Sequence, residues 1–358
     1  MHARKAVGIG ALGLVLGLAG VLGVAAAAEP AGEPKVDPEQ AAARLVTPEA
    51  DQAVARGLRW LASRQHKDGS FGTSGYYRGN VAVVSLAGMA MMAGGSLPNR
   101  GPYGREVALC LDYVLAHAQK SGYIINESFP SHGPMYGHGF ATMFLAECYG
   151  SSSRPDLRDK LAKAVELIVN TQNDAGGWRY DPKRMPADIS VTIAQVMALR
   201  AARNAGIHVP RETIERATSY IRQSQNPDGG FCYMLEGPRE SQFPRSAAAL
   251  VGLYSAGIYH GPEIDMALKY LFQFLPRKGV VRRDRSYYLY GHYYAALAMW
   301  QAGGDYFLRW YPAIRDELVA LARPDGSWAD STISPEFDTA MACLILQVPN
   351  NLLPIFQR

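Results

Sequence analysis

The sequence lacks several features that mark familiar kinds of protein. Its 358 residues include only four cysteines and no Cys-x-x-Cys pair, so the usual spacing of a zinc site is absent. No basic run is long enough to indicate nucleic-acid binding, and we expect no nucleic-acid partner. Alternating strand patterns are almost absent, which favours an all-helical fold.

The few cysteines leave two interpretations open. In an oxidising compartment they could form disulfides, and Cys110 with Cys148 is the pair we would expect, because both fall on neighbouring antiparallel helices. Simple buried thiols are the alternative for these two and for Cys232 and Cys343.

Residues 1–28 have the pattern of a signal peptide. Arg4 and Lys5 form a basic start, an apolar stretch runs from residue 7 to 24, and three alanines at 26–28 suit cleavage. An uncleaved membrane anchor is the alternative, since the apolar run is long enough to cross a bilayer. We therefore expect an exported protein, periplasmic or extracellular, with membrane contact only through such an anchor.

The rest of the chain divides into a linker and one folded domain. Residues 29–50 are rich in Ala, Pro and Glu and are predicted to be a flexible linker, followed by a domain over residues 51–358. Beyond residue 28, all 32 Asp and Glu remain and only two of the 36 Lys and Arg are lost, so this part is nearly neutral.

A short phrase recurs about every fifty residues: a Gln, a turn containing Gly, then an aromatic residue. A fixed long period indicates a repeat architecture, here of six units. Gly supplies the tight turn, the aromatic packs on the adjacent unit, and the Gln amide can bond a neighbouring helix end, so we interpret the phrase as structural. The clear copies are Gln65–Phe71, Gln172–Trp178, Gln225–Phe231 and Arg323–Trp328, and weaker ones begin at Gln119 and Gln273.

Each unit is predicted to hold two helices. The outer one carries a single apolar stripe, as in Val54, Leu58 and Leu61, whereas the second is apolar nearly all round, as in Val81–Met92. Six buried helices alternating with six amphipathic ones predict an all-α fold, an (α/α)6 toroid of six helical hairpins. The outer helices should begin near Asp51, Gly104, Asp159, Arg211, Glu263 and Pro312.

The units resemble the prenyltransferase and squalene-oxidase repeat of triterpene cyclases and protein prenyltransferase β subunits. The repeated phrase is similar to the Gln-Trp motif of the cyclases, with Phe often in place of Trp. The resemblance covers nearly all of the chain after residue 50 and implies a terpenoid cyclase-like α/α toroid. The same superfamily includes cobalamin carriers and thioester domains, but the GCGEQ of the latter is missing here.

The resemblance also carries expectations about chemistry. In the cyclases a DxDD motif begins an inner helix, and its middle Asp protonates the substrate. Here Asp188 matches the first Asp, but Ser190 stands at the donor position, and a hydroxyl cannot protonate an alkene. The prenyltransferases hold zinc with Asp-x-Cys and a distant His. Residues 243–247 have neither Asp nor Cys, and although His292 falls near the family's His, one ligand makes no zinc site; we expect no metal and no cofactor.

The tripeptide Tyr-Gly-His occurs twice, at 136–138 and 290–292, in units that would face each other across the ring. A repeated histidine suits ligand binding, proton transfer or, together with Asp188 or Asp338, metal binding. We predict Asp188, His138 and His292 as catalytic residues. The alternative is that both imidazoles make equivalent local hydrogen bonds inherited by duplication.

Other polar and aromatic residues cluster where the inner helices start. Helix capping is the alternative role for Asn80, Ser246 and Asp338, and Asp188 could equally be a cap. Aromatic and Met side chains suit an apolar guest, although they are also common in cores. The predicted ligand-binding residues are Asn80, Tyr136, Arg245, Tyr288, Tyr290 and Asp338.

Several functions remain open at this stage, and whether the protein is an enzyme is one of the open points. The first is binding of an isoprenoid or lipid-like molecule in the central cavity. The second is a cyclase-like enzyme in which a desolvated Asp188 is the acid. The third is a scaffold that binds protein or polysaccharide. A glycosidase using Asp188 and Asp338 from opposite sides of the ring is a further possibility.

Overall fold

The computed structural model describes residues 42–72, 77–129, 132–277 and 287–357. The predicted signal peptide and most of the predicted linker lie outside these residues. All of these described residues belong to one compact unit. At its start the Leu45 carbonyl accepts a hydrogen bond from Arg315, and the first described long helix begins at Pro48. Within the described ranges, no helix is both long and apolar enough to cross a membrane.

The described residues form twelve α-helices and two short 3-10 helices, with only isolated β-bridges. The amphipathic helices are α2 (Pro48–Arg64), α4 (Gly104–Ala116), α6 (Leu157–Thr171), α8 (Arg211–Gln223), α10 (Pro262–Phe272) and α12 (Gly304–Leu321). The apolar helices are α3 (Val81–Ala93), α5 (Pro134–Cys148), α7 (Ile189–Asn204), α9 (Phe243–Ser255), α11 (Tyr288–Ala302) and α13 (Pro335–Leu346). The 3-10 helices are η1 (Val348–Asn350) and η2 (Pro354–Phe356).

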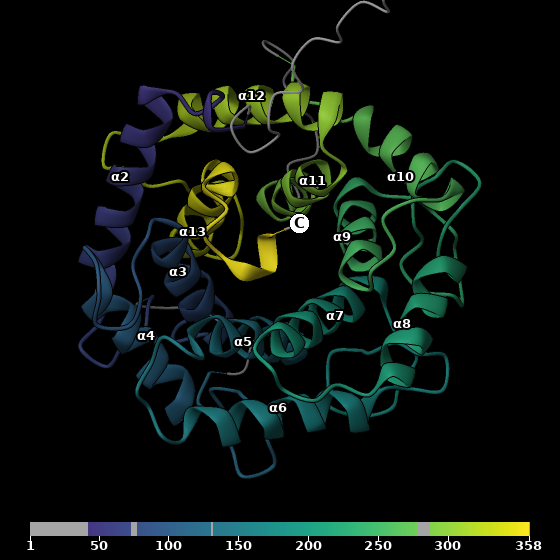
Figure 1. Cartoon of the computed structure of the whole chain (residues 1–358), viewed down its shortest axis with the longest axis horizontal. Coiled ribbons are helices and arrows are strands. Elements are labelled where there is room, and N and C mark those ends of the chain that lie inside the picture. The colour runs from purple at the N-terminus through teal and green to yellow at the C-terminus, as the bar shows by residue number, and fades with distance from the viewer. Residues whose placement is uncertain (1–41, 73–76, 130–131, 278–286, 358) are drawn as a thin grey trace, which may run out of the picture. The chain divides into compact units, whose positions relative to one another are not determined.

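The apolar helices form a closed inner ring. Each packs against the next in the order α3, α5, α7, α9, α11 and α13, and α13 returns to α3 (Figure 1). The amphipathic helices lie outside, and most pack against two neighbouring inner helices with their apolar stripe. This is the all-α (α/α)6 toroid that the sequence predicts, and α5 lies opposite α11 as expected for the paired tripeptides.

The start of the last outer helix differs from the prediction. We expected it near Pro312. Instead α12 begins at Gly304 and Pro312 lies inside it. The preceding turns bury Phe307, Trp310 and Tyr311, and this burial stabilises helix upstream of the proline.

In three of its copies, the repeated phrase holds its turn to the next outer helix through the Gln side chain, as the sequence suggested. The Gln172 side-chain amide donates to the carbonyls of Gly176, at 2.8 Å, and Thr213 in α8, at 2.9 Å. Gly176 has φ 97°, and a Cβ there would overlap the carbonyl oxygen of Arg216. Glycine is therefore required both by the backbone conformation and by the close approach of α8.

The aromatic residue of the phrase closes the corner beneath the turn. Trp178 is buried, and its indole N–H donates to the Ile168 carbonyl at 2.7 Å. On the opposite side of the ring, the Trp328 indole N–H donates in the same way to the Leu318 carbonyl at 2.9 Å. The phrase is thus a repeated structural clamp.

All four cysteines are buried and free. Cys110 and Cys148 do not form the disulfide considered above, and the Cys148 Sγ instead lies 3.8 Å from the Met92 Sδ. Burial raises the pKa of both thiols, which keeps them protonated and unreactive.

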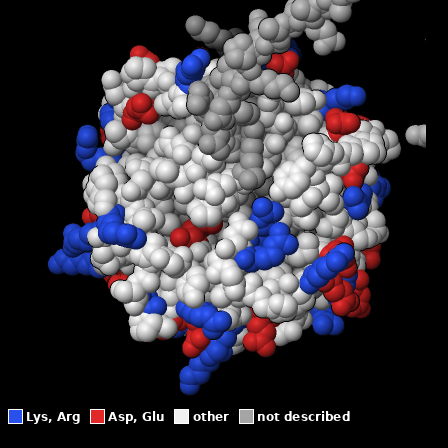
Figure 2. Space-filling model, viewed as in Figure 1, with Lys and Arg blue, Asp and Glu red and all other residues white. Residues whose placement is uncertain are grey.

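The C-terminal segment covers the end of the ring at which the inner helices finish. The 3-10 helix η2 contacts α7 and lies within the ring in Figure 1. The Phe356 carbonyl accepts from the Trp300 indole at 3.0 Å, and the Asn350 amide donates to the Ala93 carbonyl at 3.1 Å. On the face seen in Figure 2, acidic and basic side chains are interspersed around the perimeter. The opposite end, where the inner helices begin, carries the polar residues discussed next.

Candidate functional site

Asp188 is the N-cap of α7 and is fully buried. Its Oδ1 accepts from the Val191 N–H at 2.9 Å, and its own N–H donates to the Trp178 carbonyl at 3.0 Å, so the repeated phrase positions it. Burial raises the pKa of Asp188 to about 6, against the Val191 hydrogen bond and the charge of Arg179, which favour the carboxylate. The nearby Tyr233 hydroxyl also favours the ionised form of Asp188, although the Asp188 Oδ2 has no well-formed hydrogen bond.

Three half-buried tyrosines surround this carboxyl. Tyr136 comes from the first turn of α5, Tyr180 from the loop before α7, and Tyr233 from the loop before α9. The hydroxyls of Tyr180 and Tyr233 are hydrogen-bonded, and the Tyr136 and Tyr180 rings are 6.2 Å apart. Burial, with a smaller contribution from Asp188, raises the pKa of Tyr136 and Tyr233. We call Tyr136, Arg179, Tyr180, Asp188 and Tyr233 the Asp188 cluster.

Two arginines lie over the tyrosines of this cluster. The Arg179 guanidinium carbon is 4.9 Å from the Tyr180 ring centre and 5.6 Å from that of Tyr233. The Arg245 guanidinium carbon, from the first turn of α9, is 5.3 Å from the Tyr233 ring centre. Such stacking contributes about 0.5–1 kcal/mol at exposed sites. It leaves most guanidinium N–H groups available.

Tyr290 reaches the same region from α11, across the ring. Burial raises its pKa well above the usual value, and the proximity of Tyr294, Tyr136 and Asp188 adds to the shift. Its ring meets Tyr294 edge to face, with centres 4.8 Å apart. The tyrosines of the two Tyr-Gly-His tripeptides therefore approach each other.

The histidines of those tripeptides lie elsewhere. The His138 Nδ1 accepts from the Ile124 N–H at 3.2 Å, so the N–H is on Nε2, which donates to the Ala164 carbonyl of α6 at 3.2 Å. Burial lowers the pKa of His138 to about 4, so the ring is neutral at physiological pH. His138 thus links an inner helix to an outer one, which matches the local-hydrogen-bond alternative.

His292 is packed in an aromatic environment. Its ring centre lies 4.4 Å from Tyr288, 4.9 Å from Phe243 and 5.7 Å from Trp310 of α12. Tyr and His two residues apart on a helix are separated by about 200°, so one faces inward and the other outward. The structure therefore brings the paired tyrosines, and not the paired histidines, to Asp188. Tyr288 packs with His292 on that outward side.

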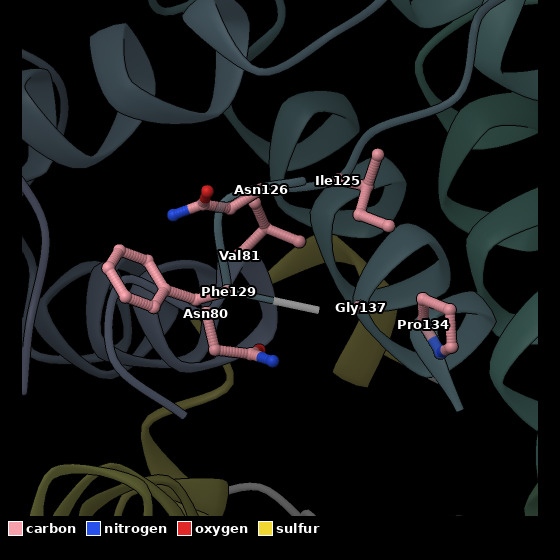
Figure 3. Close-up of a pocket in the computed structure, with 7 residues that line it drawn as sticks. All are labelled: Asn80, Val81, Ile125, Asn126, Phe129, Pro134 and Gly137. Carbon is pink, nitrogen blue, oxygen red and sulfur yellow. The ribbon is translucent and has the colours of Figure 1, made fainter. Parts of the chain in front are cut away.

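Asn80 is a helix cap, which was the alternative to its predicted role in ligand binding. It is the N-cap of α3, and its Oδ1 accepts from the Ala82 N–H at 2.8 Å. Asn80 also borders a small cavity between the beginnings of α3 and α5 (Figure 3). The cavity volume is about 10 Å³, which suits a single water and excludes an isoprenoid. Its lining residues are Asn80, Val81, Ile125, Asn126, Phe129, Pro134 and Gly137.

The expected caps Ser246 and Asp338 have other structural roles. Ser246 lies inside α9, and its hydroxyl accepts from the Phe231 N–H at 2.9 Å. The cap of α13 is Ser334, four residues before Asp338. The Asp338 Oδ2 accepts from the backbone N–H groups of Asp330, at 2.7 Å, and Ser331, at 2.8 Å. The predictions that Ser246 and Asp338 cap their helices were both wrong. The helices α9 and α13 begin earlier than the apolar residues suggested, and each has a proline in its first turn.

Arg179, Tyr180 and Tyr233 are not among the residues predicted from the sequence. Both tyrosines occur two residues after the aromatic of the repeated phrase, following Trp178 and Phe231. That shared offset was a visible signal. Within the described ranges, no three His, Cys, Asp or Glu side chains come close enough together to hold a metal ion.

Comparisons with known proteins agree with this architecture. Residues 141–276 match the family described as Prenyltransferase alpha-alpha toroid domain. Drimenyl diphosphate synthase from Streptomyces showdoensis is 26% identical over 179 residues, which are 50% of this chain and 32% of that protein. The chain therefore spans about a third of the curated relative that it matches.

Solved structures show the same fold at low identity. The type II terpene cyclase MstE from Scytonema has a TM-score of 0.61 at 15% identity, over 85% of this chain and 99% of the cyclase. An inactive variant of an alpha-1,6-mannanase from Salegentibacter has a TM-score of 0.63 at 8% identity, over 85% and 99%. The repeat pattern, the closed helical ring and these matches together identify the folded part of this chain as a terpenoid cyclase-like α/α toroid.

Proposed function

We propose that this toroid binds an apolar, isoprenoid-like molecule at the end where α5, α7, α9 and α11 begin, with its polar part beside Asp188. The main support for this proposal is the Asp188 cluster, in which a fully buried carboxyl with a pKa raised to about 6 is surrounded by three half-buried tyrosines. An isolated buried carboxyl destabilises a fold, and perturbed groups of this kind concentrate at functional sites.

The chemistry of the surroundings supports an apolar ligand. Tyrosines present a ring face to an apolar chain and a hydroxyl to a polar group. Tyr136, Tyr180, Tyr233 and Tyr290 offer such faces from four different segments. A variant of the terpene cyclase MstE was solved with the substrate geranylgeranyl dihydroxybenzoate, and the curated relative is named for a terpenoid product.

Binding is tested with native protein and with neutral isoprenoids. Lipid extraction and mass spectrometry of the purified protein should release an apolar molecule, and titration with farnesol and geranylgeraniol should show saturable binding. Tyr136→Ala and Tyr233→Ala should each weaken binding about tenfold or more, since burying a large apolar side chain against an apolar ligand contributes about 1.5–3 kcal/mol. The matched control is Tyr259→Ala, at an exposed position after α9. Absence of both a copurifying molecule and saturable binding would refute the proposal.

Acid catalysis by Asp188 is a second candidate. With a pKa of about 6, roughly one tenth of Asp188 is protonated at pH 7, so the buried carboxyl can donate a proton to a substrate. The test is incubation with squalene and shorter isoprenoids, followed by gas chromatography and mass spectrometry. A cyclised product that Asp188→Asn abolishes supports the enzyme. No product, or an unchanged product from the variant, eliminates it.

A glycosidase is less well supported. Such an enzyme needs two opposed carboxyls free to act on a sugar. The Asp338 Oδ2 accepts from two backbone N–H groups of its own loop, and its Oδ1, which lacks a hydrogen bond, is buried.

Export from the cytoplasm belongs to the same proposal and rests on the pattern of residues 1–28. Fractionation and the intact mass of the mature protein test it. A cytoplasmic full-length chain would contradict it.

A further inference from the structure

The C-terminal segment, residues 352–357, enters the ring at the end where the inner helices finish. Figure 1 shows η2 among the inner helices. The Phe356 carbonyl accepts from Trp300, near the end of α11, whereas the Phe356 ring meets the Tyr293 ring, with centres 6.2 Å apart. Tyr293 precedes Trp300 by seven residues, which correspond to about 10 Å along the helix axis. The Phe356 side chain therefore points into the ring.

Three tyrosines of α11 connect this segment with the Asp188 cluster, and we call Tyr290, Tyr293 and Tyr294 the aromatic column. Residues three and four apart are neighbours on a helix, so Tyr293 and Tyr294 lie beside Tyr290. The Tyr294 ring centre is 5.0 Å from that of Tyr293 and 4.8 Å from that of Tyr290. Tyr290 in turn approaches Asp188. The column therefore runs from the Asp188 cluster to Phe356.

The polar groups along the column are poorly satisfied while the segment is in place. Within the described ranges, the three tyrosine hydroxyls of the column are buried without a well-formed hydrogen bond, and so is the Glu147 Oε2. Glu147, at the end of α5, lies near Tyr293, and its carboxyl accepts from the Ile355 backbone. Buried polar groups without partners destabilise the arrangement that buries them. Their access to water or to a ligand therefore offsets part of the cost of displacing the segment.

The segment is held in the ring by few bonds of its own. Its regular structure is the three-residue helix η2, and the Gln301 amide donates to the carbonyls of Phe356, at 3.1 Å, and Gln357, at 3.2 Å. The inner helices pack against one another around the whole ring without it. Parts of a fold with few backbone hydrogen bonds open locally at low cost in free energy. Burial of three apolar side chains opposes this opening: Leu353, Ile355 and Phe356.

We propose that residues 352–357 are an autoinhibitory plug that occupies the space in which the apolar chain of the ligand binds. This inference rests on the proposed ligand binding and adds how that binding is regulated. The segment is apolar over residues 352–356, so it presents the same kind of surface as an isoprenoid. A ligand with its polar part beside Asp188 would extend along the aromatic column and displace the segment. Its apparent affinity is then reduced in proportion to the fraction of molecules in which the segment has left the ring.

Substitutions in the segment test the plug without changing the ring. Ile355→Ser and Phe356→Ser each remove a buried apolar side chain, so the segment should leave the ring more readily. Farnesol and geranylgeraniol should therefore bind each variant about tenfold or more tightly than they bind wild type. The matched control is Leu352→Ser, which should behave as wild type because Leu352 is 51% exposed in the same segment. Thermal unfolding identifies any variant that fails to fold, and a folding defect would lower the affinity instead of raising it.

Hydrogen exchange in the wild-type protein gives a readout that needs no variant. The backbone N–H groups of Phe356 and Gln357 donate to the carbonyls of Leu353 and Pro354. Saturation with geranylgeraniol should make these two amides exchange faster, because the ligand displaces the segment, while the amides of the outer helix α2 should not change. Unchanged or slower exchange of the two amides in the complex would mean that the ligand binds with the segment in place, and would overturn the plug.

The outcomes distinguish this inference from the proposed function. If the isoprenoids bind wild type and the affinity rises in neither Ile355→Ser nor Phe356→Ser, or rises equally in Leu352→Ser, the plug is overturned and ligand binding stands. If the affinity rises in the first two variants and not in the control, both stand. If neither isoprenoid binds wild type or any variant, the proposed function fails, and the plug, which presupposes a ligand, fails with it.

Discussion

Replacing the Asp188 carboxyl by an amide should stabilise the folded protein at neutral pH. In the folded state burial raises the pKa of Asp188 from 3.8 to about 6. The folded protein therefore binds this proton more tightly than the unfolded chain does. Stability is lost as pH rises from about 4 to about 6, and the full penalty is present at pH 7.

The size of the effect follows from that shift. Roughly two pKa units at 1.36 kcal/mol each give a penalty of about 3 kcal/mol for the carboxylate at pH 7. Opposing this, the N-terminus of α7 favours a negative charge by about 0.3–1 kcal/mol. Asn caps a helix as well as Asp does, so the bond from the Val191 N–H is kept. The net gain expected for Asp188→Asn is about 2 kcal/mol at pH 7 and near zero at pH 4.

The assay is urea unfolding of wild type and Asp188→Asn at pH values from 4 to 7.5. Comparing the two proteins at each pH cancels the titration of all other groups. Asp174→Asn, at an exposed turn position, is the matched control and should show no pH-dependent difference from wild type. A variant that is less stable than wild type at pH 7, or a difference that stays constant from pH 4 to 7, would refute the reasoning.

Three further substitutions test the scaffold by chemical unfolding. Gly176→Ala should destabilise the fold by more than about 3 kcal/mol, because it adds a clash with the Arg216 carbonyl to the strain of φ 97°. The control Gly206→Ala, also at positive φ but facing open space, should destabilise it by only about 1 kcal/mol. Equal losses of stability in the two variants would contradict the clash. His138→Phe should lose about 2–5 kcal/mol by leaving two buried backbone groups unpaired, yet ligand affinity of the folded variant should not change. Burial raises the pKa of Glu147 to about 8. The stability of Glu147→Gln relative to wild type should therefore rise between pH 4.5 and 8, and the two proteins should be equally stable at pH 4. A stability difference that does not change with pH would contradict this.

The fold followed from the sequence because its signals are local and repeated. The Gln–Gly–aromatic phrase predicts a turn, and the spacing of apolar residues separates amphipathic from fully buried helices. Six such units leave a closed ring as the arrangement that buries all of them. The start of α12 was mispredicted because three buried aromatics, a tertiary effect, extend the helix upstream of Pro312.

The candidate site followed only in part, since it depends on which side chains converge. Asp188 was found because it begins an inner helix and matches a known segment. We predicted the histidines as site residues because histidine is a common catalytic residue. Helical periodicity instead directs the tyrosines of the same tripeptides inward, toward Asp188. Arg179, Tyr180 and Tyr233 lie in loops, where no periodicity indicates direction, and the packing of α7 against α9 brings these loops together.

The same repeated clamp explains how the fold tolerates a buried carboxyl. In the third unit Gln172 and Trp178 fix the turn to two helices, and the Trp178 carbonyl holds the Asp188 N–H. Position and burial of Asp188 are thus imposed by contacts that recur around the ring, while its carboxyl gains only one well-formed hydrogen bond, at Oδ1. In the sixth unit the corresponding region holds Asp338, whose Oδ2 receives two. In both units one carboxyl oxygen, Asp188 Oδ2 or Asp338 Oδ1, is buried without a hydrogen bond. The two units differ in their loops: backbone N–H groups of Asp330 and Ser331 donate to Asp338, whereas the side chains of Arg179 and Tyr233 lie near Asp188.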